Sequence, residues 1–168
     1  MLTDLSDVFL PLQEEIHYFI SEFQNRKGYG QGALTLRIQS ILKDQLAMDK
    51  TIISLLNHAF FGLNVHLKQL ANSQNYIWNF PNNPFSNSIT IDGIIEYLNV
   101  FLRVSDNLLR SVDISRFRGD LVKFQDDLYS YKQRLAKLTS HCIHHMGQAL
   151  VLHGLLTEFV RQESWVEV

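Results

Sequence analysis

A run of side chains at helical spacing in the C-terminal third restricts the possible fold of this chain most strongly. The run keeps a three-four spacing over about nine turns. Its members are Leu128, Tyr131, Leu135, Leu138, Cys142, His145, Ala149, Leu152, Leu156 and Phe159. This period places them on one face of an α-helix, with Asp126 or Asp127 available to cap its start. Such a face must be buried against other elements, so the sequence predicts a long helix inside a helical assembly.

Three further segments carry the same apolar period. They run from residue 5 to 23, from residue 49 to about 71 and from residue 91 to 112. Thr3 or Asp4 is available as the N-cap of the first segment. Residues 33–47 form either a separate short helix or the first turns of the second segment. Because strand-like alternation is absent, we expect residues 1–168 to form a single all-α domain, a four-helix bundle.

Three segments predict breaks between these helices. The longest is the polar stretch 73–88, which contains two prolines and is typical of a long crossover loop between the second and third helices. Residues 25–32 contain three glycines, which make helix costly. Residues 113–120 form the third break. Aromatic side chains in the crossover are expected to pack over one end of the bundle or, alternatively, to line a pocket: Tyr76, Trp78, Phe80 and Phe85.

Composition and charge argue against several classes of function. The net charge is -2 and no stripe of Lys and Arg occurs, so no electrostatic feature favours nucleic-acid binding. No apolar run approaches the roughly 18 residues of a membrane span, and the acidic start does not resemble a signal peptide. Cys142 is the only cysteine, so no internal disulfide can form. We therefore expect a soluble cytoplasmic protein.

The histidines are the feature with the clearest chemical meaning. Among the seven histidines, His141 and His145 are four residues apart and therefore lie one above the other on a helical face. Two imidazoles at this spacing can bind one metal ion. His144 lies about 100° away from His145 around the helix. The alternative is that His141 and His145 are buried, neutral side chains of the bundle core.

A third metal ligand is expected from the second helix, which carries His58 and His66. The helical wheel places His66 nearer the centre of the apolar stripe and His58 at its margin, so periodicity alone leaves both open. His17 and His153 are expected to be solvated or to flank the site. Cys142 is expected to be a buried core side chain rather than a nucleophile.

Two short windows resemble a known family. The run HCIHHMGQ, residues 141–148, resembles the H-x-x-x-H-R-G-Q signature near the last helix of the DinB/YfiT-like superfamily. MDKTIISLLNHAFFGLN, residues 48–64, resembles the His-bearing second helix of that family. The order of helices and crossover is also similar over nearly the whole chain.

This resemblance implies a site made of His58, His141 and His145. In the family such a triad binds one divalent transition metal, here Zn or Ni or else Fe, and leaves coordination positions open. Gln148 of the same signature is expected either to orient a ligand through a hydrogen bond or to be a plain residue of the helix surface. One departure is Met146, which stands where the family often has Arg and puts the family's substrate in doubt here.

The resemblance also implies a function. Relatives include thiol S-transferases and proteins described as hydrolases, so we expect a metal-dependent enzyme acting on a small molecule such as a low-molecular-weight thiol. Relatives of this fold often pair, which predicts a homodimer without nucleic-acid or membrane partners. Asp92 and Glu96 cannot be assigned as a general base from the sequence. The alternative is a non-catalytic dimeric binding domain whose metal site is structural or vestigial.

Overall fold

The computed structural model describes residues 5–36, 51–112, 121–124 and 127–163, and the side chains of residues 121–130 are not described. The described elements are α1 (Ser6–Asn25), α2 (Lys27–Ala33), α3 (Ile52–Ser73), α4 (Ile91–Ser111), β1 (Leu121–Phe124), β2 (Asp127–Ser130) and α6 (Tyr131–Glu163). The proposed caps Thr3, Asp4 and Asp126, the segment 37–47 and the break at 113–120 lie outside the described residues.

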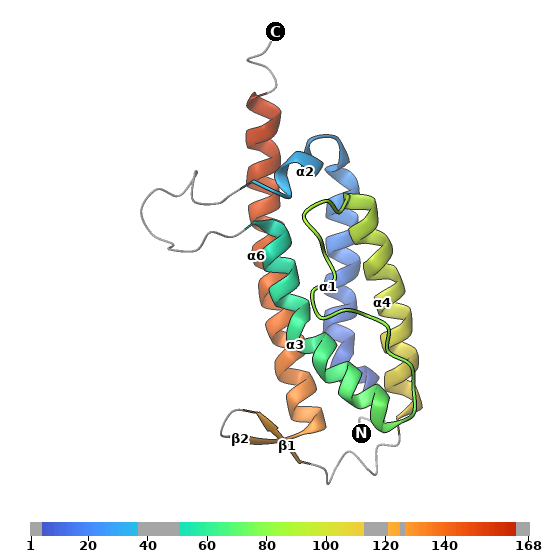
Figure 1. Ribbon diagram of the computed structural model, residues 1–168. Coiled ribbons are helices and arrows are strands. Elements are labelled where there is room, and N and C mark those ends of the chain that lie inside the picture. The colour runs from blue at the N-terminus through green and yellow to red at the C-terminus, as the bar shows by residue number, and fades with distance from the viewer. Residues whose placement is uncertain (1–4, 37–50, 113–120, 125–126, 164–168) are drawn as a thin grey trace.

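The helices assemble around the long C-terminal helix α6, as the sequence predicts (Figure 1). Helices α1, α2 and α3 pack on α6, and α4 packs on α1. Figure 1 shows α1 and α6 running in one direction and α3 and α4 in the opposite one. The predicted helical class is confirmed, and the described chain also contains one short pair of strands.

The starts of α3 and α4 are fixed by threonine caps. Thr51 and Ser54 exchange side-chain-to-backbone hydrogen bonds at the first turn of α3, which satisfies backbone N–H groups that the helix leaves free. The Thr90 hydroxyl accepts from the Gly93 N–H at the start of α4. The two helices therefore begin at Ile52 and Ile91, close to the predicted limits of the second and third segments.

The crossover between α3 and α4 is long because these helices are parallel, so the chain must return along the bundle (Figure 1). Its aromatic side chains fill the space between the two helices. Trp78 and Phe80 contact Phe101 of α4, and Phe85 contacts Phe60 of α3 in an edge-to-face arrangement. The predicted packing role is confirmed, although these contacts lie midway along the helices rather than at one end.

The break predicted at residues 25–32 is confirmed where α1 ends at Asn25, but most of the segment is not a loop, because it forms the short helix α2. Long-range contacts outweigh the low helix propensity of its glycines. The ring of His153 on α6 donates from Nε2 to the Gly30 carbonyl at 2.9 Å. The Gln31 side chain bonds to the backbone of Ile89 and Ile91 at the start of α4, at 3.2 and 2.8 Å.

Gly30 permits the close approach of α2 to α6, and this predicts opposite effects for two neighbouring glycines. A Cβ at Gly30 lies 2.8 Å from Cε1 of the buried His153 ring, whereas a Cβ at Gly28 meets no atom within 4 Å. Gly30→Ala is expected to lower the free energy of unfolding by about 1–3 kcal/mol through overpacking. Gly28→Ala is expected to raise it by about 0.5–1 kcal/mol through helix propensity. Urea titration of both variants checks this pair, and equal effects would contradict it.

The start of the last helix differs from the prediction. Residues 127–130 form β2, which pairs with β1 in antiparallel register, so α6 begins at Tyr131 rather than at Leu128. Asp127 lies in this strand, four residues before the first residue of α6, and is therefore not at the N-cap position. The expected absence of strands is therefore wrong for this hairpin, whose two strands have only four residues each.

The buried face of α6 is rotated relative to the predicted stripe. Its buried side chains include Thr139, Met146 and His153. With Leu135, Cys142, Ala149 and Leu156 they keep a regular four-three spacing. Leu138, His145 and Leu152, which were placed in the stripe, are only partly buried on its flank, and Phe159 is exposed. Two of the true core residues are polar, so an apolar pattern does not detect them.

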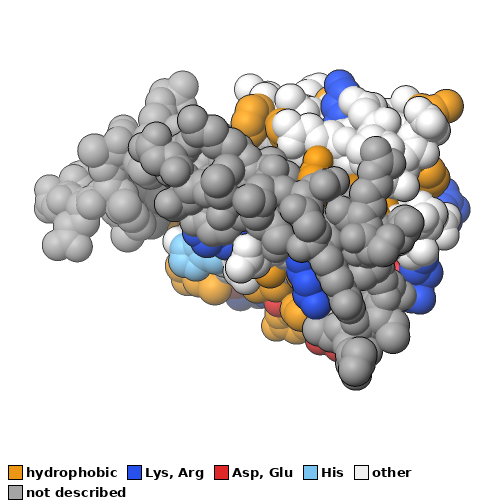
Figure 2. All heavy atoms as spheres, turned by 90° about the horizontal axis from the view of Figure 1, so that it is seen from below, with side chains coloured by type: hydrophobic (Ala, Val, Ile, Leu, Met, Phe, Trp, Pro, Cys, Tyr) orange, Lys and Arg blue, Asp and Glu red, His pale blue; other side chains and the backbone are white. Residues whose placement is uncertain are grey.

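None of the helices among the described residues is long and apolar enough to cross a membrane. Figure 2 shows the molecule from the lower end in Figure 1. Where side chains are coloured in that view, those of Lys and Arg lie at separate places among hydrophobic and other atoms.

Candidate metal centre

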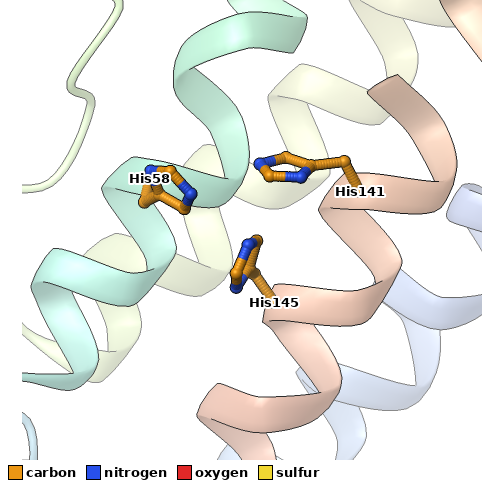
Figure 3. A group of neighbouring side chains, drawn as sticks. All are labelled: His58, His141 and His145. Atoms are coloured by element: carbon orange, nitrogen blue, oxygen red, sulfur yellow. The ribbon is translucent and has the colours of Figure 1, made fainter. Parts of the chain in front are cut away.

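The structure brings His58, His141 and His145 together between two helices. His58 comes from α3 and the other two from α6, and the rings point toward one another across the gap (Figure 3). Ring centroids are 5.0 Å apart for His58 and His141, 4.6 Å for His58 and His145, and 4.5 Å for His141 and His145. One nitrogen from each ring lies within 4.8 Å of the others.

Close packing of α3 on α6 next to the site sets this convergence. A Cβ at Gly62 lies 2.9 Å from Leu138 Cδ2, so a larger residue there requires the Leu138 side chain to move. The helices are antiparallel (Figure 1), and His58 lies one turn before Gly62 while His141 lies one turn after Leu138. The same close contact therefore places the histidines of both helices at one level.

The three rings are accessible to solvent. His58 is exposed, His145 is half-buried, and His141 is at least partly exposed. The alternative that the pair on α6 consists of buried core histidines is therefore wrong. Partial exposure matters because a metal ion and a substrate must reach the nitrogens from outside.

Local electrostatics keep the α6 pair neutral near pH 7. Partial burial, followed by the neighbouring His58 and His144, lowers the pKa of His141. Partial burial also lowers the pKa of His145, against an opposing hydrogen bond from Gln148. A neutral imidazole has a free lone pair, which is the form that binds metals.

Gln148 bonds directly to one of the three rings. His145 Nδ1 lies 2.8 Å from Gln148 Oε1, so the ring donates its Nδ1 proton to the amide oxygen. This bond leaves the Nε2 lone pair of His145 available to a metal and fixes the orientation of the ring. The structure thus provides the contact that the ligand-orienting role of Gln148 requires.

Asn57, the neighbour of His58 on α3, holds the crossover in place. Its amide donates to the Phe85 carbonyl at 2.7 Å and its oxygen accepts from the Phe85 N–H at 2.9 Å. Sequence reasoning missed this residue, and also Gly62, because neither has a metal-binding side chain. The only sequence signal for the contact between Asn57 and Phe85 is that Asn57 stands next to the candidate ligand His58.

The other histidines lie outside the group. His66 and His153 are fully buried, so the expectation that His153 is solvated or flanking is wrong. His17 is exposed on α1, as expected. Burial, followed by the nearby Arg134, lowers the pKa of His66 to about 4. The His66 ring also contacts the Tyr131 ring at a tilted angle, with centroids 5.5 Å apart, and belongs to the core.

Four further residues singled out in the sequence also lie away from the three rings. Cys142 is fully buried, and burial raises the pKa of its thiol, so it is an inert core side chain as expected. Met146 is fully buried too, so the position that carries Arg in the family faces the core here. Asp92 pairs with Lys27 of α2, and Glu96 is exposed on α4.

The residues present fit a divalent transition metal. Zn–N bonds are about 2.0–2.1 Å long and the usual geometry is tetrahedral, so two nitrogens on one ion lie about 3.4 Å apart. Side chains whose ligand atoms are already within 4.8 Å reach this separation by small ring rotations. The described residues therefore contain a three-His group that can hold a metal ion.

Comparison of the chain with family models, curated proteins and solved structures gives no match. The case for function therefore rests on the arrangement of the three histidines and on the resemblance drawn from the sequence.

Proposed function

We propose that this protein binds one divalent transition-metal ion through His58, His141 and His145, as the centre of a metal-dependent enzyme. The observation that carries the proposal is the convergence of three accessible imidazoles from two helices. His141 and His145 are brought together by local helix geometry, whereas His58 reaches them only through the packing of α3 on α6. Chance placement of histidines on one helix does not explain this third member.

The donor set supports a catalytic site rather than a closed structural one. Three nitrogen ligands leave at least one coordination position for water or substrate, and imidazole suits Zn, Ni or Fe. When bound, such an ion lowers the pKa of a water or of a thiol and thereby prepares a nucleophile. The chain contributes the orientation of His145 through Gln148 and an approach from solvent past the exposed His58.

The substrate class follows from the resemblance to the DinB/YfiT-like superfamily, which we retain as part of the proposal. It favours thiol S-transfer or hydrolysis of a small molecule, with a low-molecular-weight thiol as the first compound to test. The buried Met146 removes the family's arginine from this site. We therefore expect recognition of an anionic substrate group, if present, to differ from that of relatives with Arg at this position.

A second candidate is a non-catalytic dimeric domain in which the metal only joins two helices. The observation that favours it is the position of the site, which bridges α3 and α6 beside the tight contact between Gly62 and Leu138. An ion placed there stabilises the fold whether or not it performs chemistry. Activity measurements, rather than metal binding, separate the two candidates.

Elemental mass spectrometry on the untagged protein tests the proposed site first. We expect about one transition-metal ion per wild-type chain, as a three-His centre implies. His58→Ala and His145→Ala should lose it, and His17→Ala, which removes an exposed histidine outside the group, should retain it. Metal-loaded protein is then assayed with thiol acceptors and hydrolysable esters and amides. Absence of metal from the wild type, even after incubation with Zn²⁺ or Ni²⁺, would reject the proposal.

Gln148 provides a finer prediction about the same site. Gln148→Ala removes the acceptor of the His145 Nδ1 proton, so the affinity for Zn²⁺ is expected to fall about 10–100-fold. Gln148→Glu keeps an acceptor oxygen at this position and should retain most of the affinity. Competition with a chromophoric chelator measures the affinity for Zn²⁺ of the wild type and both variants. Equal losses of affinity in the two variants would argue against an orienting hydrogen bond.

A further inference from the structure

His144 is an exposed histidine at the edge of the three-His group, and neither the packing nor the proposed site uses it. Its ring centroid lies 5.0 Å from that of His145, which equals the separation of the His58 and His141 rings. Consecutive residues diverge by about 100° around a helix, so this nearness reflects a side chain turned toward its neighbour. An exposed histidine without a role is the simplest alternative.

The position of His144 suits a temporary ligand better than a permanent one. It is not among the three rings whose nitrogens all lie within 4.8 Å of one another, so it does not complete the group as it stands. It does lie beside one member of that group, His145, on the solvent-exposed side. A hydrated ion arriving from solvent can therefore bind His144 while the three-His group is still unfilled.

We propose that His144 is an exchange ligand, which binds an incoming divalent ion together with His145 and passes it to His58 and His141. Each transfer replaces one metal–water or metal–imidazole bond by another, so no co-reactant is needed. Gln148 holds the His145 ring, and this fixes the ligand that both binding positions share. The inference rests on the proposed metal site and adds a route by which that site is filled and emptied.

This role has a kinetic signature. Because a shared route speeds filling and emptying equally, removing it slows both processes and leaves the equilibrium affinity unchanged. We expect His144→Ala to lower the association rate constant for Co²⁺ about tenfold, within the range by which single changes alter association rates. Release to an excess of chelator should slow by the same factor.

Stopped-flow absorption with Co²⁺ measures both rates in the wild type, His144→Ala and His17→Ala. His17→Ala removes an exposed histidine on α1 and should leave both rates unchanged. Unaltered rates in His144→Ala, with wild-type binding intact, would overturn the exchange role but not the metal site. A loss of equilibrium affinity with an unchanged association rate would also overturn it, because His144 would then be a permanent fourth ligand. No binding of Co²⁺, Zn²⁺ or Ni²⁺ by the wild type would overturn the metal site and this inference together.

Discussion

Saturating Zn²⁺ or Ni²⁺ is expected to raise the free energy of unfolding of the wild-type protein by about 2.7 kcal/mol when free metal exceeds the dissociation constant 100-fold. The physical reason is that unfolding separates His58 on α3 from His141 and His145 on α6, which destroys the three-ligand group. Metal therefore binds the folded state in preference to the unfolded one. Urea titration with and without metal measures the gain, and a chelator should abolish it.

His58→Ala is the decisive variant for this effect. It leaves only the pair on α6, which one helix can present without α3, so most of the metal-dependent gain should disappear. Because His58 is exposed, the variant should have the same stability as the wild type in the absence of metal. His17→Ala, on the exposed face of α1, should keep the full gain. A metal-dependent gain that survives in His58→Ala would show that the ion binds elsewhere.

The second large effect is a loss of stability in acid that originates at His66. This ring is fully buried, and its pKa is about 4 in the fold against an ordinary value of 6.5. The unfolded state therefore takes up a proton first as the pH falls. The free energy of unfolding is therefore unaffected by the protonation of His66 above pH 6.5. It falls progressively as the pH is lowered from 6.5 to about 4, by about 3 kcal/mol in total.

His66→Phe tests this prediction because phenylalanine cannot take up a proton. The decline in the free energy of unfolding between pH 6.5 and 4 should be smaller in this variant by about 3 kcal/mol than in the wild type. A remaining decline is expected because the buried His153 also has a lowered pKa. Both proteins should be measured without metal, because metal binding requires deprotonated ligands and is itself pH-dependent. An unchanged decline in His66→Phe would contradict the assignment.

The sequence predicted the helical elements well where the signal was local. Apolar periodicity placed α1, α3, α4 and α6, and the prolines and asparagines of residues 73–88 marked the crossover. It marked the end of α1 at residue 25 but not the helix α2 that follows, which forms because Gly30 and Gln31 contact α6 and α4. These contacts join residues 60 or more positions apart in the sequence, so they cannot be predicted from local helix propensity.

The candidate site shows a similar division. The spacing of His141 and His145 was visible in the sequence, but periodicity could not choose between His58 and His66. The wheel was informative in an unexpected way, since it put His66 near the centre of the apolar stripe and the structure buries it completely. His58, at the margin of that stripe, is exposed instead. Metal ligands on packed helices are to be sought at the edge of the apolar face, where a side chain can meet both its neighbours and solvent.

The face of α6 was misjudged because its core contains polar side chains. Thr139 and His153 are buried members of the four-three pattern, whereas Leu138 and Leu152 are only partly covered. A stripe chosen by hydrophobicity is therefore turned toward the flank that carries His145. With the face correctly placed, Met146 belongs to the core and His145 lies half-buried at its edge.

The pair of hydrogen bonds between Asn57 and the Phe85 backbone has a consequence for the neighbouring histidine. A helix that packs through a smooth apolar face can roll about its own axis, and a roll of about 10–20° is enough to misalign a site. Asn57 ties α3 to a chain segment that lies beside it, so it acts as a stop against such rolling. The crossover therefore helps to fix the orientation of His58, and substitutions in this loop, which contributes none of the three histidines, are expected to alter the geometry of the site.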